Sequence, residues 1–175
     1  AKKVTCKKPY VYKNVKNSKK IINIVAIDFG CKKNILDLFV ASGFRVTVVP
    51  CTYSFENIMK QKPLGIFLSN GPGDPYATGK YALKTIKNII KSNIPTFGIC
   101  LGHQLLGLAL GAKTKKMHHG HHGVNQPVKN LKSKRIEITS QNHGFMIDSS
   151  SLPKDLYISH ISLFDNVIQG IEHKS

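Results

Sequence analysis

The sequence predicts an α/β fold: a doubly wound, mostly parallel open sheet with helices on both faces, followed by an antiparallel extension after residue 111. Residues 21–27 form a continuous apolar run, the pattern of a strand buried on both faces. Apolar runs of this kind alternate with helical segments as far as residue 110. After Gly111 the segments become shorter and are separated by turn residues, as in antiparallel strands.

The elements follow in order from these patterns. The first strand ends at Asp28, and Gly43 ends the helix that follows it. In the parallel part we expect strands over 21–27, 45–50, 64–68 and 94–99. We expect helices over 32–42, 55–61 and 78–91, and a fourth helix that follows the strand over 94–99 and ends at 110. In the extension we expect strands over 128–131, 135–139, 156–160 and 167–171.

Two regions are expected along the chain. Residues 1–20 are rich in Lys and Asn and show no sustained periodicity, which predicts a linker. Residues 21–175 are expected to form one domain, long enough to bury a hydrophobic core. The sequence does not begin with Met, so we expect it to be a piece of a longer chain.

The formal net charge of +17 raises the possibility of a nucleic-acid partner. Arginine makes the bidentate contacts of specific readers, yet the only arginines are Arg45 and Arg135. The lysines are spread along the whole chain, as on a solvated surface. We therefore expect no nucleic-acid partner, and a basic docking face for a partner domain is the stronger alternative.

Location is inferred from apolar runs and cysteines. No apolar run is long enough to span a bilayer, and the amino end lacks a signal-peptide pattern, so no membrane association is expected. The four cysteines fall in separate elements without a Cys-x-x-Cys pair. This pattern favours neither a disulfide framework nor a zinc site, and predicts a reducing, cytoplasmic location.

Cys100 is the candidate nucleophile. It stands between Gly98 and Gly102, where a buried strand turns into a helix, in the Gly-x-nucleophile-x-Gly spacing of a nucleophile elbow. The helix N-terminus favours a negative sulfur. The alternative is a buried structural cysteine.

A second candidate segment is the loop over residues 69–75, Ser-Asn-Gly-Pro-Gly-Asp-Pro, which follows the third strand of the parallel sheet. Its glycines allow main-chain N–H groups to point into a site, toward a phosphate or a developing oxyanion. The Lys and Ser/Thr of a phosphate-binding motif are missing, which favours the oxyanion. An ordinary turn is the remaining alternative.

The elbow with Gln104, the loop over 69–75 and the segments 121–125 and 140–145 together resemble the class I (triad) glutamine amidotransferase domain of carbamoyl-phosphate synthetase. The elbow and glycine loop are shared by the wider class. The Gly-His-His-Gly and Gln-Asn-His-Gly-Phe sequences, with residues 162–165 and 170–173, are similar to the carbamoyl-phosphate branch. The likeness runs from about residue 22 to residue 173.

The resemblance implies that Cys100 attacks the carboxamide of glutamine, forming a γ-glutamyl thioester and releasing ammonia. It implies that the N–H groups of Gly71 and Leu101 form the oxyanion hole. The positions that it assigns to glutamine binding are Gly71, Gly73, Leu101, Gln104, Asn142, Gly144 and Phe145.

The partner that the resemblance implies is a carbamoyl-phosphate synthetase domain or subunit, which receives the ammonia and serves pyrimidine or arginine biosynthesis. ATP and Mg would belong to that partner, so no cofactor or metal is expected in this domain.

The sequence departs from the family at its catalytic base. The family uses a His-x-Glu motif downstream of residues 170–173, and no His-x-Glu occurs up to Ser175. His143 is the best internal substitute, whereas His103 lies on the nucleophile's own helix. We therefore expect low activity for this fragment. Two alternatives stay open: a catalytically silent docking or regulatory domain, and a cysteine hydrolase of a related peptidase or chaperone type.

Residues 118–122 contain four histidines around Gly120, which raises the possibility of a transition-metal site. In an extended run, neighbouring side chains point to opposite faces, a poor arrangement for tetrahedral coordination. We therefore expect no metal here.

Overall fold

The computed structural model describes residues 1–13 and 21–174. The chain divides into two compact units, Ala1–Leu105 and Leu106–Ser175, where the sequence analysis expects a single domain after residue 20. Each unit has its own hydrophobic core, and each is described by itself. In the part of the chain described, no helix is long and apolar enough to cross a membrane.

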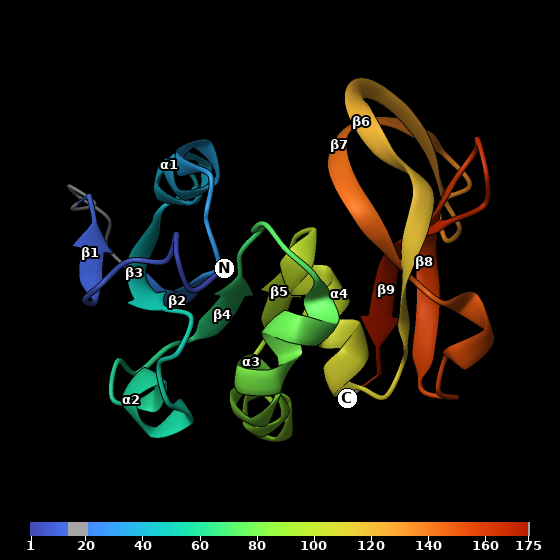
Figure 1. Ribbon diagram of the computed structural model, residues 1–175. Coiled ribbons are helices and arrows are strands. Elements are labelled where there is room, and N and C mark those ends of the chain that lie inside the picture. Colours follow the sequence, from blue (N-terminus) through green and yellow to red (C-terminus); the bar gives the residue numbers. More distant parts are fainter. Residues whose placement is uncertain (14–20, 175) are drawn as a thin grey trace. The chain divides into compact units, whose positions relative to one another are not determined.

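The first unit holds a five-stranded sheet in the order β1-β3-β2-β4-β5 (Figure 1). Strands β2 to β5 are mutually parallel, which confirms the predicted doubly wound arrangement. Figure 1 shows α1 on one side of this sheet and α2 and α3 on the other. The strands are β1 (Tyr10–Tyr12), β2 (Ile22–Asp28), β3 (Phe44–Pro50), β4 (Gly65–Leu68) and β5 (Thr96–Gly98). The helices are α1 (Lys33–Ala41), α2 (Phe55–Met59), α3 (Pro75–Lys91) and α4 (Leu101–Ala109), the last of which continues into the second unit.

The core of the first unit explains why the central strands are apolar throughout. From Val25 to Ile27 every residue of β2 is at most 3% exposed, so both faces of the strand are covered, as predicted. Side chains of β2, β3, β4 and α1 pack into one cluster around Phe67. This packing fixes the carboxyl ends of the parallel strands at one edge of the sheet.

The amino end differs from the expected linker. Residues 10–12 form β1, which pairs antiparallel with β3 through partners such as Val11 and Thr47. The strand has only three residues and pairs at a sheet edge, so backbone hydrogen bonds and not apolar periodicity define it. The remainder of the predicted linker, residues 14–20, lies outside the described residues.

The second unit holds an antiparallel sheet in the order β7-β6-β8-β9, which confirms the predicted extension. Its strands are β6 (Thr114–Asn130), β7 (Ile136–Ile147), β8 (Leu156–Ser162) and β9 (Ile168–His173). Strand β6 begins well before its predicted start, and β7 ends well after its predicted end. Most of the extra residues are polar or glycine and are exposed or only partly covered, so pairing exists there without the apolar alternation on which the prediction depends.

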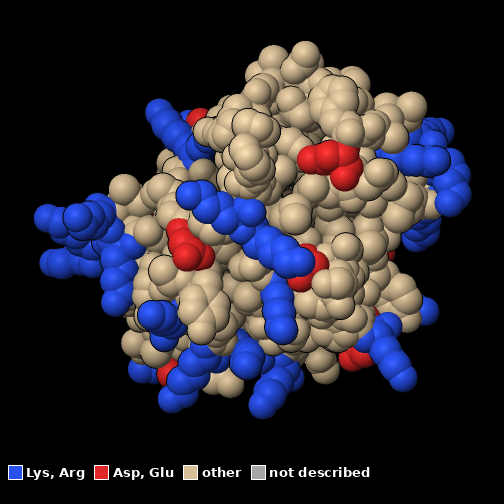
Figure 2. Space-filling view, turned by 45° about the vertical axis from the view of Figure 1, so that its right-hand side comes forward, with Lys and Arg blue, Asp and Glu red and all other residues tan. Residues whose placement is uncertain are grey.

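Basic side chains are numerous on the molecular surface. On the face shown in Figure 2, Lys and Arg side chains are spread around and between uncharged regions, with single acidic residues among them. This distribution agrees with the scatter of lysines along the sequence.

Candidate active site

Cys100 lies at the turn between β5 and α4, where the predicted elbow is. Its φ is +54°, in the left-handed region that costs a non-glycine residue about 1–2 kcal/mol. Its carbonyl accepts the N–H of Gln104 at 3.0 Å, so the helix begins directly at the cysteine. The strained backbone is a local geometry that the surrounding packing must maintain.

The two glycines of the elbow are required by close backbone contacts. A Cβ on Gly102 would lie 2.1 Å from the carbonyl oxygen of Leu68, at the end of β4. A Cβ on Gly98 would lie 2.6 Å from the carbonyl carbon of Gly102. Side chains at these positions would therefore force β4, β5 and α4 apart.

The glycine loop over residues 69–75 adjoins the elbow. The N–H of Gly102 donates to the carbonyl of Ser69 at 3.1 Å, which ties the loop to the first turn of α4. Gly71 sits so tightly against the preceding loop that a Cβ there would lie 2.2 Å from the carbonyl oxygen of Phe29. At its far end Asp74 caps α3 by accepting the N–H of Tyr76 at 2.7 Å.

Besides burial, three groups influence the pKa of the Cys100 thiol. Burial raises the pKa of this thiol above its ordinary value, while the N–H of Leu101, the positive charge of Lys32 and the N–H of Gly71 act in the opposite direction. The two N–H groups are those that the sequence analysis assigns to an oxyanion hole. Leu101 is the first residue of α4 and Gly71 lies in the glycine loop, so two separate segments lower the pKa of the thiol.

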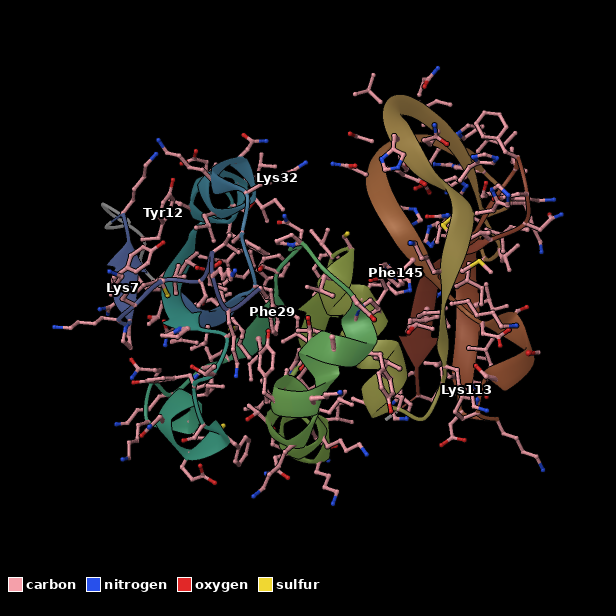
Figure 3. The ribbon with its side chains drawn as sticks, in the orientation of Figure 1. Lys7, Tyr12, Phe29, Lys32, Lys113 and Phe145 are labelled. Atoms are coloured by element: carbon pink, nitrogen blue, oxygen red, sulfur yellow. The ribbon has the colours of Figure 1, made fainter. Side chains whose placement is uncertain are left out.

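Lys32 influences this site through its charge, and no sequence motif points to it. It is the exposed N-cap residue of α1, in the loop that follows β2 (Figure 3). A usable signal is present in the sequence, because this loop must share the carboxyl edge of the sheet with the elbow. The general scatter of lysines hides it.

The other predicted glutamine contacts fall in both units. In the first unit, Gln104 is 6% exposed on α4, and Gly73 is an exposed residue of the glycine loop with φ +108°. In the second unit Asn142, Gly144 and Phe145 all lie on β7. The Oδ1 of Asn142 is 2.7 Å from the Nδ1 of His122 on β6, which orients the amide.

Within the histidine cluster of residues 118–122, the ring of His121 contacts two other side chains. His121 is 8% exposed, and its Nε2 lies 2.9 Å from Oδ2 of Asp165 while its Nδ1 lies 3.1 Å from Nε2 of Gln169. Among residues 1–13 and 21–174 no group of three or more His, Cys, Asp or Glu side chains is arranged to hold a metal ion. Both ring nitrogens of His121 serve the packing of the second unit.

His143, the candidate substitute base, is also engaged on both sides. Its Nδ1 lies 2.9 Å from the carbonyl oxygen of Phe145, and its Nε2 lies 3.1 Å from Oε1 of Gln141. Burial lowers the pKa of His143 below its ordinary value. A general base needs a ring nitrogen within reach of the substrate, and here both serve β7.

The profile of the family Glutamine amidotransferase class-I matches residues 25–175. The carbamoyl phosphate synthase small chain of Bradyrhizobium diazoefficiens is 62% identical over 150 residues, which cover 86% of this chain and 38% of that relative. That of Bartonella bacilliformis is 56% identical over 181 residues, covering 98% and 45%. The chain thus spans less than half the length of these curated relatives.

Solved structures confirm the fold. A glutamine amidotransferase from Thermotoga maritima has a TM-score of 0.70 at 21% identity, covering 87% of this chain and 71% of its own. One from Methylobacillus flagellatus has a TM-score of 0.64 at 17% identity, with 90% and 67% covered.

Proposed function

Because the chain belongs to the class-I glutamine amidotransferase family, we propose that it hydrolyses glutamine at Cys100 and supplies the ammonia to a carbamoyl-phosphate synthetase domain or subunit. The observation that carries the proposal is the strained turn at Cys100, where the N–H groups of Leu101 and Gly71 lower the thiol pKa against the effect of burial. The similarity to carbamoyl phosphate synthase small chains supports the choice of partner.

The reaction begins with attack of the Cys100 thiolate on the side-chain carboxamide carbon of glutamine. The carbonyl oxygen becomes an oxyanion, which the N–H groups of Gly71 and Leu101 stabilise by about 3 kcal/mol each. When the tetrahedral species collapses, the C–N bond breaks, a proton is added to the nitrogen and ammonia leaves. Water then cleaves the γ-glutamyl thioester, giving glutamate and restoring the thiol.

We also propose a glutamine-binding role for the residues to which the family resemblance assigns one. In the proposal Gly73 and Gln104 join the oxyanion donors, and Asn142, Gly144 and Phe145 on β7 complete the set. The amide of Asn142 suits the charged ends of a free amino acid, and the ring of Phe145 suits its methylenes. ATP and Mg are assigned to the synthetase partner.

The proton transfers need a general base. In the family this base is the His of a His-x-Glu motif, which does not occur in these 175 residues. Burial also disfavours the Cys100 thiolate, because it raises the pKa of the thiol above its ordinary value. We therefore propose that the chain alone turns over slowly and reaches full activity with the family's downstream motif. The same two observations favour the second candidate, a silent domain that binds or regulates the synthetase.

A glutamine-like chloroketone tests the site. Mapping of the adduct should find the reagent on Cys100, and glutamine should protect against it. Modification of another cysteine, or modification of Cys100 that glutamine does not slow, would show that the site is wrongly assigned.

Measurement of ammonia release distinguishes an active enzyme from a catalytically silent domain. We expect background release from residues 1–175 and a large increase when the downstream sequence of a relative is joined, abolished by Cys100→Ser. If the extended protein reacts with the chloroketone at Cys100 but releases no ammonia, the silent domain would be favoured.

A further inference from the structure

Asp28 is a buried carboxylate at the carboxyl end of β2, 8% exposed, which the proposed reaction does not use. Its Oδ1 accepts the N–H groups of Gly30 at 2.9 Å and Cys31 at 2.8 Å, and so shapes the loop before α1. Its Oδ2 accepts the N–H of Cys6 at 2.7 Å. One side chain therefore joins the amino-terminal segment to the loop after β2.

The loop after β2 is in turn bound to the loop that carries Gly71. The Asn70 side chain donates to the carbonyl of Gly30 at 3.1 Å and accepts the N–H of Lys32 at 3.1 Å. Ser69 Oγ accepts the N–H of Phe29 at 2.9 Å. These bonds work as a short bridge between the two loops, so displacement of one displaces the other.

Gly30 is enclosed between the amino-terminal segment and the glycine loop. A Cβ built on it would lie 3.0 Å from Cγ2 of Val4 and 2.9 Å from Cδ of Pro72. The main-chain nitrogen of Ala1 also donates to the carbonyl of Pro72 at 3.3 Å. The segment expected to be a linker therefore contacts the glycine loop directly.

The amino-terminal segment is fixed from its other side as well. Thr5 Oγ1 accepts the N–H of Cys51, at the end of β3, at 3.0 Å. Lys2 Nζ lies 4.4 Å above the ring centre of Tyr81 on α3. The segment thus connects the ends of β2, β3 and β4 through contacts that the first unit alone provides.

Resting on the proposed function, the geometry assigns Asp28 as a positioning residue for the loop of Gly71, with residues 4–6 holding that loop through Asp28 and Gly30. Asp28 touches neither the sulfur nor glutamine in this proposal. It acts by fixing where the Gly71 N–H lies relative to Cys100. If the loop moves, Cys100 loses a donor that lowers the thiol pKa, and the oxyanion loses one of its two donors.

Asp28→Asn tests this assignment with almost no change in shape. The amide keeps the oxygen that accepts from Gly30 and Cys31, but its nitrogen faces the N–H of Cys6, donor to donor. The matched control is Asp37→Asn, which removes the exposed ion pair with Lys13 and leaves the loops untouched. The readout is the pH profile of Cys100 alkylation by iodoacetamide in the full chain, followed on the Cys100 peptide.

We expect the Asp28→Asn profile to shift to higher pH and alkylation near neutral pH to slow about fivefold, which corresponds to about 1 kcal/mol. Asp37→Asn should match the wild type. A folded Asp28→Asn chain with the wild-type profile would overturn the assignment. Circular dichroism and thermal unfolding report whether each variant folds.

Thr5→Val keeps the test decisive if Asp28→Asn does not fold, because it removes only the acceptor for Cys51 and conserves the side-chain shape. It should shift the profile in the same direction by a smaller amount, and an unchanged profile would then reject the role of the segment. Failure of the proposed function has a different signature: glutamine would not protect Cys100 even in the wild type.

Discussion

The N–H of Gly102 donates to the carbonyl of Ser69 at 3.1 Å, so the first turn of α4 is hydrogen bonded to the beginning of the glycine loop. Through this bond the elbow and the loop form one backbone unit around Cys100. The start of the glycine loop is therefore fixed against α4 by a main-chain bond. The position of the Gly71 N–H, two residues further on, also depends on the side-chain bonds of Asn70 to the loop after β2.

Gly102→Ala should be strongly destabilising, because its Cβ would lie 2.1 Å from the carbonyl oxygen of Leu68. We expect the free energy of unfolding to fall by about 3 kcal/mol or more, as overpacking against a backbone atom cannot be relieved by a side-chain rotation. Urea unfolding measures the loss. Gly144→Ala is the control, since nothing lies within 4 Å of its Cβ position. Equal stability of the two variants would contradict the packing described.

Lys32→Met should raise the pKa of Cys100 further, because Lys32 is the charge that opposes the effect of burial. Only the thiolate is alkylated, so the reaction near neutral pH should slow by about twofold to fivefold. Lys32 is exposed, and added salt should reduce the difference between variant and wild type. Lys33→Met serves as the neighbouring control, and an equal effect there would show that the position of the charge does not matter.

Much of the first unit could be predicted because its signals are local. The apolar run of β2 and the Gly-x-Cys-x-Gly spacing of the elbow both report directly on burial and backbone geometry. β1 could not be predicted, because it has only three residues. They form a strand only through backbone pairing with the edge of β3. Lys32 was hidden for a similar reason: its charge influences the Cys100 thiol from a loop that is distant in the sequence but shares the carboxyl edge of the sheet.

The second unit shows the limit of periodicity more clearly. Residues 114–127 belong to β6 although their side chains are mainly Lys, His and Gly, and the register shifts twice along the pairing with β7. Backbone pairing holds such a strand while much of its surface faces solvent. A segment of this kind carries no apolar alternation, so its extent becomes visible only in the structure.

His143 should make the chain less stable as pH falls through about 6.5, the ordinary pKa of histidine. Burial lowers its pKa in the folded state, so the unfolded state binds the proton first and is favoured below that pH. His143→Gln should flatten the fall in the free energy of unfolding over this range. Asp148, whose pKa Lys115 lowers, contributes only at more acidic pH.

Urea unfolding at a series of pH values measures this effect, with the exposed His173→Gln as control. The wild type and His173→Gln should lose stability in parallel. If His143→Gln loses it equally, burial of the imidazole does not determine the acid sensitivity.

Asn142→Ala should weaken glutamine binding without changing the thiol. The proposed role of Asn142 is a hydrogen bond to a charged end of glutamine, and its loss should raise by about tenfold the glutamine concentration that protects Cys100. His122→Ala should have a smaller effect in the same direction, because His122 Nδ1 holds the Asn142 amide at 2.7 Å. Alkylation of Cys100 without glutamine should remain at the wild-type rate in both variants, and a change in that rate would mean that β7 affects the nucleophile and not the substrate.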